Sequence, residues 1–161
     1  MMQKAVFGGG CFWHIQYAFS KVPGVVRTTA GYMGGDEEKY RDVTYQEVCT
    51  GKTGYAEVVL VEFDSKKISY RKLLKIFWTE HDPTTINRQG LDVGTSYRSA
   101  IFYFNDLQKN EAEKSKNEAG KDFMRPIVTE ISKARKFVKA EEYHQNYVEK
   151  NGGIDACYVR I

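Results

Sequence analysis

The chain has 161 residues, of which 42% are hydrophobic and 14% aromatic, and its net charge at pH 7 is +3. This length and composition fit one globular domain and exclude a disordered tail. The charge is too small to imply a nucleic acid or an anionic membrane as partner, and no apolar run approaches the length of a membrane span. The N-terminal segment lacks a hydrophobic stretch of signal-peptide length, so we expect no export signal.

Three cysteines, Cys11, Cys49 and Cys157, are spread widely along the chain. An odd and widely spaced set is not typical of a secreted domain held by disulfides. It favours a reducing compartment, where any disulfide is transient and catalytic. We therefore expect a cytoplasmic protein that is able to carry out thiol chemistry.

The N-terminal part of the sequence predicts a strand, a helix and a second strand. Residues 4–9 form a short strand pattern that ends in glycines. Apolar residues recur at three- and four-residue spacing over 12–22, which predicts an amphipathic helix ended by Pro23-Gly24. Residues 25–33 predict the next strand. Residues 34–54 predict a long loop, and loops of that length in a compact domain are usually functional.

The central part predicts strand, helix and strand again. Residues 55–64 give the clearest strand pattern of the chain. Ser69 is placed to cap a helix whose apolar residues between Tyr70 and Trp78 form one stripe. An irregular segment, 81–97, is followed by a strand pattern at 98–104.

The C-terminal part predicts a helix, a strand and a short helix. Asn105 and Gln108 predict a capping box that opens a polar helix ending near Phe123. Residues 127–131 read as a strand and residues 140–151 as a short helix. The resulting order, β-α-β-β-α-β-α-β, predicts a single-domain α+β sandwich with helices on one side of a mixed or antiparallel sheet.

Cys11 lies between three glycines and two aromatic residues. The predicted strand-glycine-helix order places it at or just before a helix N-terminus, where unsatisfied N–H groups and the helix dipole lower a thiol's pKa. The glycines would also let another molecule approach the backbone closely. A small structural residue under a helix start is the alternative, and position alone does not separate the two.

Glu57 is a charged residue on an apolar strand face. Strand alternation places it on the same face as Val59, Val61 and Phe63. Burial there would favour the protonated carboxyl group that a general acid requires. A strand-end carboxylate that reaches water remains the alternative.

The other polar candidates lie in irregular segments. Spacing alone assigns no role to Tyr45, Tyr97 or Asp92, because most tyrosines belong to the core or its rim. Cys49 lacks the glycine and helix-start context of Cys11, and we interpret it as a buried structural residue.

Cys157 lies in a C-terminal tail that contains glycines. Tails are mobile unless they are tied down, and we expect mobility from about residue 149. A mobile thiol could reach an oxidised Cys11 and form a disulfide. A buried position in a terminal strand is equally compatible with the sequence.

The sequence contains weak signals of three other functions. Cys11 and His14 have a C-x-x-H spacing, but no second ligand pair follows, so we expect no metal site. A hydrolase dyad of Cys11 with His81 or His144 stays open, because such partners meet only in space. RNA binding through a strand with aromatic residues lacks the expected glycines, although a basic cluster lies nearby. That cluster consists of Lys133, Arg135, Lys136 and Lys139.

Five segments, in order along nearly the whole chain, resemble the peptide methionine sulfoxide reductase A family. The block around Cys11 and the glycine- and tyrosine-containing block before residue 100 are specific enough to make coincidence of both very improbable. The segments are GGGCFW (8–13), AGYMGG (30–35), TYQEVCTGKTGYAEV (44–58), HDPTTINRQGLDVGTSYRSAIF (81–102) and YHQNY (143–147).

The resemblance implies a role for each matching residue. Cys11 matches the nucleophile, and Phe12 and Trp13 match the aromatic pair that receives the S-methyl group of the substrate. Glu57 matches the acid that protonates the sulfoxide oxygen. The chemistry implied is attack of a thiolate on sulfur, which leaves a sulfenic acid on the cysteine.

The resemblance also implies the surroundings of that reaction. Tyr45 and Tyr97 match the phenols that hold the sulfoxide oxygen, and Asp92 matches a carboxylate in the same polar site. Cys157 matches the resolving cysteine by location. The implied fold is an α+β sandwich with a ferredoxin-like core. The implied substrate is the S epimer, and thioredoxin is the implied reductant. We expect a monomer with no bound cofactor.

Four positions depart from the family's usual pattern. They are His14, Tyr55, Leu91 and Ser96. None of these changes removes a nucleophilic or hydrogen-bonding group assigned above. His14 would lie one helical turn from Cys11, and we hypothesise that its imidazole promotes ionisation of the thiol.

Overall fold

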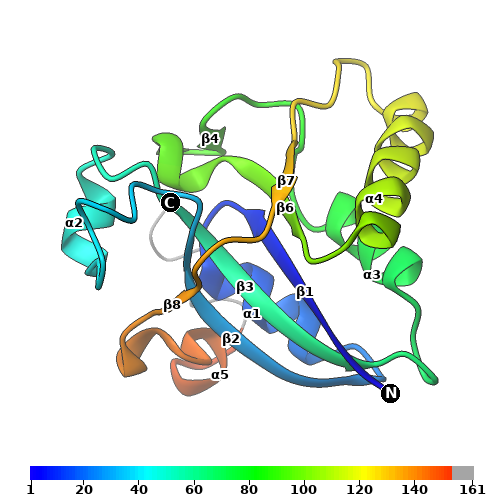
Figure 1. Ribbon diagram of the computed structural model, residues 1–161, viewed down its shortest axis with the longest axis horizontal. Helices are drawn as coiled ribbons and strands as arrows, with labels where there is room; N and C mark the ends of the chain where they lie inside the picture. Colours follow the sequence, from blue (N-terminus) through cyan, green and yellow to red (C-terminus); the bar gives the residue numbers. More distant parts are fainter. Residues whose placement is uncertain (154–161) are drawn as a thin grey trace.

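A computed structural model describes residues 1–153 and shows a six-stranded mixed sheet with helices packed on it (Figure 1). The strand order is β7-β6-β1-β3-β2-β8; β6 and β7 run parallel, and all other neighbours run antiparallel. β4 and β5 form a separate two-stranded hairpin. The strands are β1 (Met2–Gly9), β2 (Val25–Met33), β3 (Ala56–Asp64), β4 (Arg88–Gln89), β5 (Asp92–Val93), β6 (Ser99–Tyr103), β7 (Glu130–Lys133) and β8 (Val138–Lys139).

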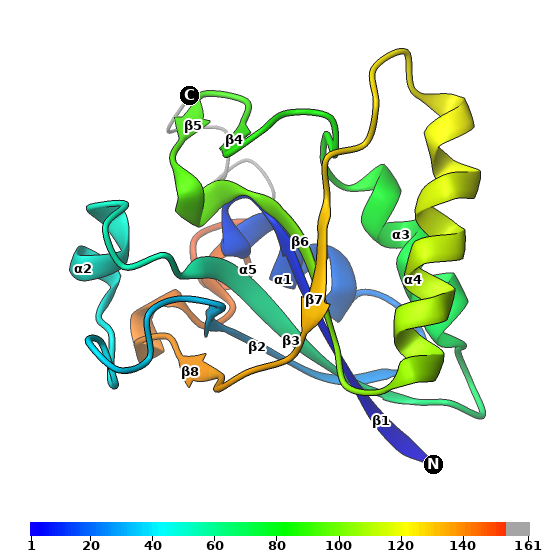
Figure 2. The ribbon, with the colours of Figure 1, turned by 45° about the horizontal axis from the view of Figure 1, so that its top comes forward.

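Helices α1 and α3 cover one face of the sheet, and α4 lies beside α3 (Figure 2). Trp78 on α3 donates its indole N–H to the hydroxyl of Ser115 on α4 at 2.8 Å, which joins these two helices. The helices are α1 (Phe12–Ser20), α2 (Tyr45–Cys49), α3 (Tyr70–Thr79), α4 (Asp106–Ala119) and α5 (Tyr147–Lys150), with 3₁₀ turns at Thr95–Tyr97, Gly120–Asp122 and Glu142–His144.

The four central strands have the ferredoxin-like arrangement. The chain runs β1-α1-β2-β3-α3-β6, and the corresponding strands lie in the order β6-β1-β3-β2. The predicted fold, a single α+β sandwich with a ferredoxin-like core and helices on one side, is confirmed. Strand alternation divides the core, since Val59 and Val61 pack toward the helices while Val58 packs on the opposite face.

The connections between elements differ from the prediction at several places. The predicted loop 34–54 contains α2, which starts at a full capping box between Thr44 and Glu47. The last predicted strand, 127–131, begins later as β7. Strand β8 was not predicted. The predicted helix 140–151 is broken by Asn146, whose φ of 53° is left-handed.

The predicted cap of α4 forms only in part. The side chain of Asn105 accepts the backbone N–H of Gln108 at 2.9 Å. The amide of Gln108 accepts the N–H of Phe104 rather than that of Asn105, and it donates to the carbonyl of Lys4 on β1. Gln108 therefore ties the helix start to the sheet instead of closing a capping box.

Candidate active site

Cys11 is the N-cap residue of α1, at the point where β1 passes through glycines into the helix. Its φ of −55° and ψ of 122° are not helical, so the first N–H groups of α1 follow directly after its side chain. The residue is half-buried. The predicted helix-start position is confirmed, and the residue reaches the surface.

The glycines before Cys11 are packed against the protein's own side chains. A Cβ at Gly10 would lie 2.5 Å from Gln89, and one at Gly9 would lie 3.1 Å from the ring of His81. Gly10 also has a φ of +92°, which L side chains rarely adopt. The interpretation that the glycines leave room for another molecule is therefore wrong, because Gln89 and His81 occupy that space.

Glu57 lies next to Cys11 even though 46 positions separate them in the sequence. It sits near the start of β3 and is 2% exposed. Its Oε1 accepts the backbone N–H of Phe12 at 3.3 Å. Burial raises the pKa of Glu57 to about 8 against the opposing effect of that hydrogen bond, and the charge of Asp92 raises it further. The carboxyl group is therefore protonated near neutral pH, and the alternative of a solvated strand end is excluded.

Tyr45, Tyr97 and Asp92 converge on the same carboxyl group from separate elements. Burial raises the pKa of Tyr97, and the charges of Glu57, Asp92, Cys49 and Cys11 add to this effect. Burial and the charge of Glu57 likewise raise the pKa of Tyr45 at the start of α2. Both phenols stay protonated and can donate hydrogen bonds. The structure thus brings these predicted residues together around Glu57.

Phe12 and Trp13 belong to a cluster of aromatic rings. Tyr147 stacks on Trp13 with centroids 3.6 Å apart and an angle of 8° between the planes. The ring of Phe12 lies 5.1 Å from that of His144, and the ring of Tyr45 lies 4.3 Å from it. An adjoining pocket of about 460 Å³ is lined by Trp13, Tyr45, Gln46, Cys49, Tyr143, His144 and Tyr147.

The segment 140–147 holds part of this cluster, although the sequence indicated His144 only as a possible hydrolase partner and predicted no role for the segment in the reductase site. The carboxylate of Glu141 accepts the phenol of Tyr32 and the backbone N–H of Tyr45, each at 3.0 Å. The first of these bonds reaches β2 and the second reaches the start of α2. The sequence signals were a family segment and a histidine among tyrosines at 143–147, and neither reveals which strand the segment joins.

A model of the peptide methionine sulfoxide reductase family matches residues 3–161. The chain belongs to this family. Peptide methionine sulfoxide reductase MsrA of Geobacter metallireducens is 53% identical over 154 residues, covering 94% of this chain and 93% of its own. Mxr1 of Saccharomyces cerevisiae in reduced form has a TM-score of 0.90 at 38% identity, covering 93% of this chain and 86% of its own. Mxr1 in complex with Trx2 has a TM-score of 0.64 at 25% identity, covering 91% and 84%.

The predicted resemblance is therefore confirmed, and the chain is an enzyme, an oxidoreductase that acts on methionine sulfoxide. Among residues 1–153, no group of His, Cys, Asp and Glu side chains is arranged to hold a metal ion. None of the helices in this range is long and apolar enough to cross a membrane.

Cys49 differs from its predicted environment in this reductase. It is exposed at the end of α2, not buried. Its thiol is hydrogen-bonded to the phenol of Tyr45 and lines the aromatic pocket. Partial desolvation of the sulfur by its neighbours and the charges of Glu57 and Glu141 raise its pKa, in opposition to the Tyr45 bond. Cys157 lies outside the residues that the structure describes.

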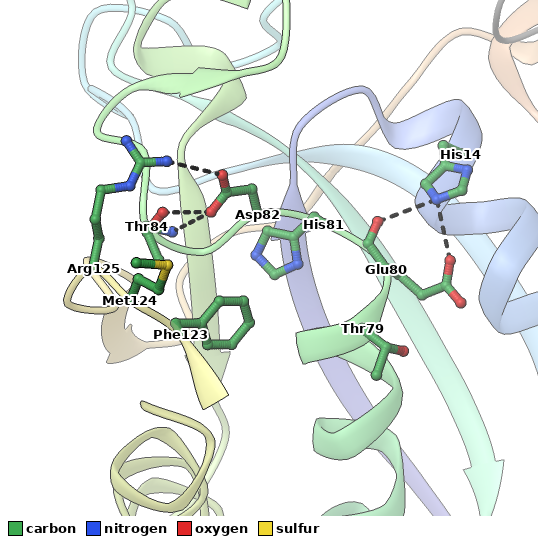
Figure 3. A pocket seen from close by; sticks show the side chains of 9 residues that line it. All are labelled: His14, Thr79, Glu80, His81, Asp82, Thr84, Phe123, Met124 and Arg125. Carbon is green, nitrogen blue, oxygen red and sulfur yellow. Dashed lines mark hydrogen bonds and ion pairs between the residues drawn. The ribbon is translucent and has the colours of Figure 1, made fainter. Parts of the chain in front are cut away.

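His14 binds α3 rather than any residue of the cluster around Glu57. Figure 3 shows its ring directed at Glu80, where Nε2 lies 3.2 Å from both the backbone carbonyl and the carboxylate. Glu80 is the C-cap of α3, so the contact fastens the first turn of α1 to the end of α3. An effect of His14 on the ionisation of Cys11 stays a prediction.

Figure 3 shows a second pocket, of about 760 Å³, which is separate from the aromatic pocket. Several of the side chains that line it form ion pairs or hydrogen bonds with one another or with the backbone. Asp82 accepts bonds from the hydroxyl and N–H of Thr84 and lies 3.5 Å from Arg125. His81 is hydrogen-bonded through both ring nitrogens, to Phe77 and Ser99, each at 2.7 Å. A dyad of Cys11 with His81 is therefore not formed.

The basic cluster that raised the possibility of RNA binding is largely paired with acids. Its ion pairs are Arg135 with Glu37, Lys136 with Asp42 and Lys139 with Glu142. Paired charges offer little attraction for phosphates, and membership of the reductase family supersedes this alternative.

The other three positions that depart from the family pattern differ in their burial and contacts. Tyr55 is buried and donates its phenol to the carbonyl of Tyr40 at 2.9 Å, and its ring packs on Gly35. Ser96 is buried in the turn before Tyr97. Leu91 is exposed at the tip of the β4–β5 hairpin.

Proposed function

We propose that this chain reduces methionine-S-sulfoxide, free or within proteins, to methionine, with Cys11 as nucleophile and Glu57 as acid. Residues 1–161 then form one catalytic domain that acts as a monomer and needs no bound cofactor. The odd cysteine count and the thiol chemistry favour a cytoplasmic location.

The observation that carries the proposal is the pairing of Cys11 and Glu57 across the N-terminus of α1. The carboxyl group accepts the N–H of Phe12, the residue after Cys11, and its pKa is about 8. The N–H groups of the helix start stabilise a thiolate at Cys11. A nucleophile that favours its ionised form thus lies beside an acid that keeps its proton.

The proposed reaction transfers the sulfoxide oxygen to Cys11. The thiolate attacks the sulfoxide sulfur, while the proton of Glu57 is delivered to the oxygen and makes the sulfur electrophilic. The hydroxyl group then passes from the substrate sulfur to Sγ of Cys11, which breaks the sulfur–oxygen bond and forms the Sγ–oxygen bond. The Sγ–sulfur bond made by the attack breaks, and methionine leaves with that electron pair on its sulfur. Cys11 becomes a sulfenic acid, oxidised by two electrons, and the substrate is reduced by two.

The surrounding residues orient this step in the proposal. Tyr45 and Tyr97, whose phenols stay protonated, hydrogen-bond the sulfoxide oxygen, and Asp92 completes the polar site. Phe12 and Trp13 receive the S-methyl group, an apolar contact that sets the orientation of the sulfur. Their buried position in the aromatic cluster supports this role.

Regeneration requires a second thiol and a dithiol reductant. We propose that the thiol of Cys157 condenses with the sulfenic acid, releasing water and forming a disulfide that thioredoxin reduces by exchange. Binding of Trx2 by the related Mxr1 supports thioredoxin as the partner. Cys49 is the alternative resolving thiol, because it is exposed and lies near Tyr45.

A single-turnover assay with separated sulfoxide epimers tests the proposal. Pre-reduced wild-type protein should yield one equivalent of methionine or slightly more from the S epimer and none from the R epimer. Cys11→Ser should yield none. Production of methionine by Cys11→Ser, or equal use of both epimers, would overturn the proposal.

Steady-state turnover with thioredoxin identifies the resolving thiol. Cys157→Ser should complete one turnover and then stop, whereas the matched variant Cys49→Ser should continue to cycle. The reverse pattern would assign the resolving role to Cys49.

A further inference from the structure

We propose that His144 is a positioning residue that fixes the indole of Trp13 and thereby sets the affinity for the sulfoxide substrate. The inference deepens the proposed function, on which it rests, by giving a role in substrate binding to a residue that the family resemblance left without one. His144 lies in the 3₁₀ turn Glu142–His144 and is 1% exposed.

The contact between the two side chains is a buried hydrogen bond. The indole Nε1–H of Trp13 donates to Nδ1 of His144 at 2.9 Å. An indole N–H is a donor only, so Nδ1 must accept and the neutral ring carries its proton on Nε2. Because the indole is 4% exposed, loss of the acceptor would leave a buried donor in need of another partner.

The bond complements the stacking that holds the indole plane. Tyr147 covers Trp13 with a centroid distance of 3.6 Å, which restrains tilting of the ring. Stacking restrains sliding and rotation within the plane less sharply than a hydrogen bond does, because a hydrogen bond weakens steeply when its angle changes. The directional hydrogen bond to His144 restrains the indole of Trp13 against these in-plane motions.

His144 also contacts the rings that surround the proposed substrate site. Its centroid lies 4.3 Å from Tyr45 and 5.1 Å from Phe12. One imidazole therefore touches the proposed oxygen-binding phenol and both rings of the proposed methyl site. Its position determines their spacing.

The backbone on both sides of His144 is fixed to the sheet and to α1. The amide of Gln145 binds both the N–H and the carbonyl of Ala30 on β2, each at 2.9 Å. The N–H of Asn146 donates to the side chain of Gln16 on α1 at 2.9 Å. The acceptor is thus held by the same helix that carries Trp13, which gives the pair a constant geometry.

Two substitutions separate the acceptor from the ring. His144→Phe keeps an aromatic ring and removes the acceptor, whereas His144→Asn removes the ring and places an amide oxygen near the position of Nδ1. Ser115→Ala is the matched control, because it removes the acceptor of the other buried indole, Trp78, at 2.8 Å. The measurements are the ¹⁵N–¹H spectrum of the two indoles and the sulfoxide concentration that gives half-maximal single-turnover rate.

In His144→Phe we expect the Trp13 indole signal to shift while that of Trp78 stays. The half-saturating sulfoxide concentration should rise about tenfold, with the limiting rate within about twofold of wild type. His144→Asn should restore part of that loss. Ser115→Ala should shift only the Trp78 signal and leave substrate affinity unchanged.

Two results would overturn the inference while leaving the reductase activity intact. One is wild-type affinity in His144→Phe with a shifted Trp13 signal. The other is a larger affinity loss in His144→Asn than in His144→Phe, which would show that the ring and not the acceptor matters. Failure of wild-type protein to reduce the sulfoxide would instead refute the proposed function.

Discussion

The carboxyl group of Glu57 is buried among apolar strand residues, and its pKa of about 8 exceeds the ordinary value of 4.5. The folded chain therefore binds this proton more tightly than the unfolded chain does. The contribution of Glu57 to the free energy of unfolding is at its maximum below pH 4.5 and is lost as the pH rises toward 8. The loss at pH 7 is roughly 3 kcal/mol, a cost that keeps a proton available for chemistry.

Glu57→Gln should therefore stabilise the protein at high pH. Glutamine keeps an acceptor for the N–H of Phe12 and cannot ionise. The free energy of unfolding, measured with urea, should be within about 1 kcal/mol of wild type at pH 5 and exceed it by about 3 to 4 kcal/mol at pH 8. Glu62→Gln is the control on the same strand, because Glu62 pairs with Arg27 and its pKa is lowered by that bond. Equal destabilisation of Glu57→Gln at both pH values would contradict the buried acid.

At the scale of the elements, the connection from β1 to α1 depends on the backbone conformation of Gly10. Gly10→Ala should cost about 2 to 4 kcal/mol of unfolding free energy, because φ is +92° and the added carbon would lie 2.5 Å from Gln89. Gly90→Ala has a positive φ of 60° but no atom within 4 Å, and should cost only about 1 kcal/mol. Urea denaturation of both variants measures the difference. Equal costs would show that the Gln89 contact does not constrain this connection.

The regular elements were predictable because their signals are local. The spacing of apolar residues predicted α1 and α3. The alternation of apolar residues predicted β3 and placed Glu57 on the strand face that packs toward the helices. Strand β8 and the break at Asn146 depend on bonds to distant residues. Val138 pairs with Tyr32, and Asn146 donates to Gln16. No pattern within a few residues of either position indicates these contacts.

Across the whole molecule, one hydrogen-bonded chain of side chains makes stability sensitive to acid. The Nδ1–H of His81 donates to the carbonyl of Phe77, so Nε2 accepts from Ser99, whose oxygen accepts from Thr129 at 2.7 Å. This chain joins α3 to β6 and to the residue before β7. Burial lowers the pKa of His81 to about 4, and a second proton on the ring would break the bond to Ser99.

The pKa of His81 in the folded protein lies below its ordinary value of 6.5. The contribution of His81 to the free energy of unfolding is therefore at its maximum above pH 6.5 and is lost as the pH falls toward 4. The contribution of this group should fall by about 1 to 2 kcal/mol between pH 7 and pH 5. Urea midpoints of wild type and His81→Gln measure it, and the variant should lose less stability over that range. An identical loss in both proteins would contradict this role.

Local context made two residues of the site candidates, Cys11 at a helix start and Glu57 on an apolar strand face. It left a structural alternative open for each, and the resemblance supplied their roles. The resemblance supplied Tyr45, Tyr97 and Asp92, whose convergence requires the folded chain. Glu141 and Gln89 were missed and His144 was considered only as a hydrolase partner, because their roles arise from contacts with residues far away in the sequence.

The central claim is that a protonated Glu57 assists attack by a Cys11 thiolate. The most direct test is the pH dependence of the single-turnover rate with methionine-S-sulfoxide in wild type and Glu57→Gln. The wild-type rate should fall as the pH rises through about 8, where the acid ionises. Glu57→Gln should be slower by about 10²-fold at pH 7 and should show no such fall. A wild-type rate that stays constant to pH 10, or a variant as fast as wild type, would contradict the account.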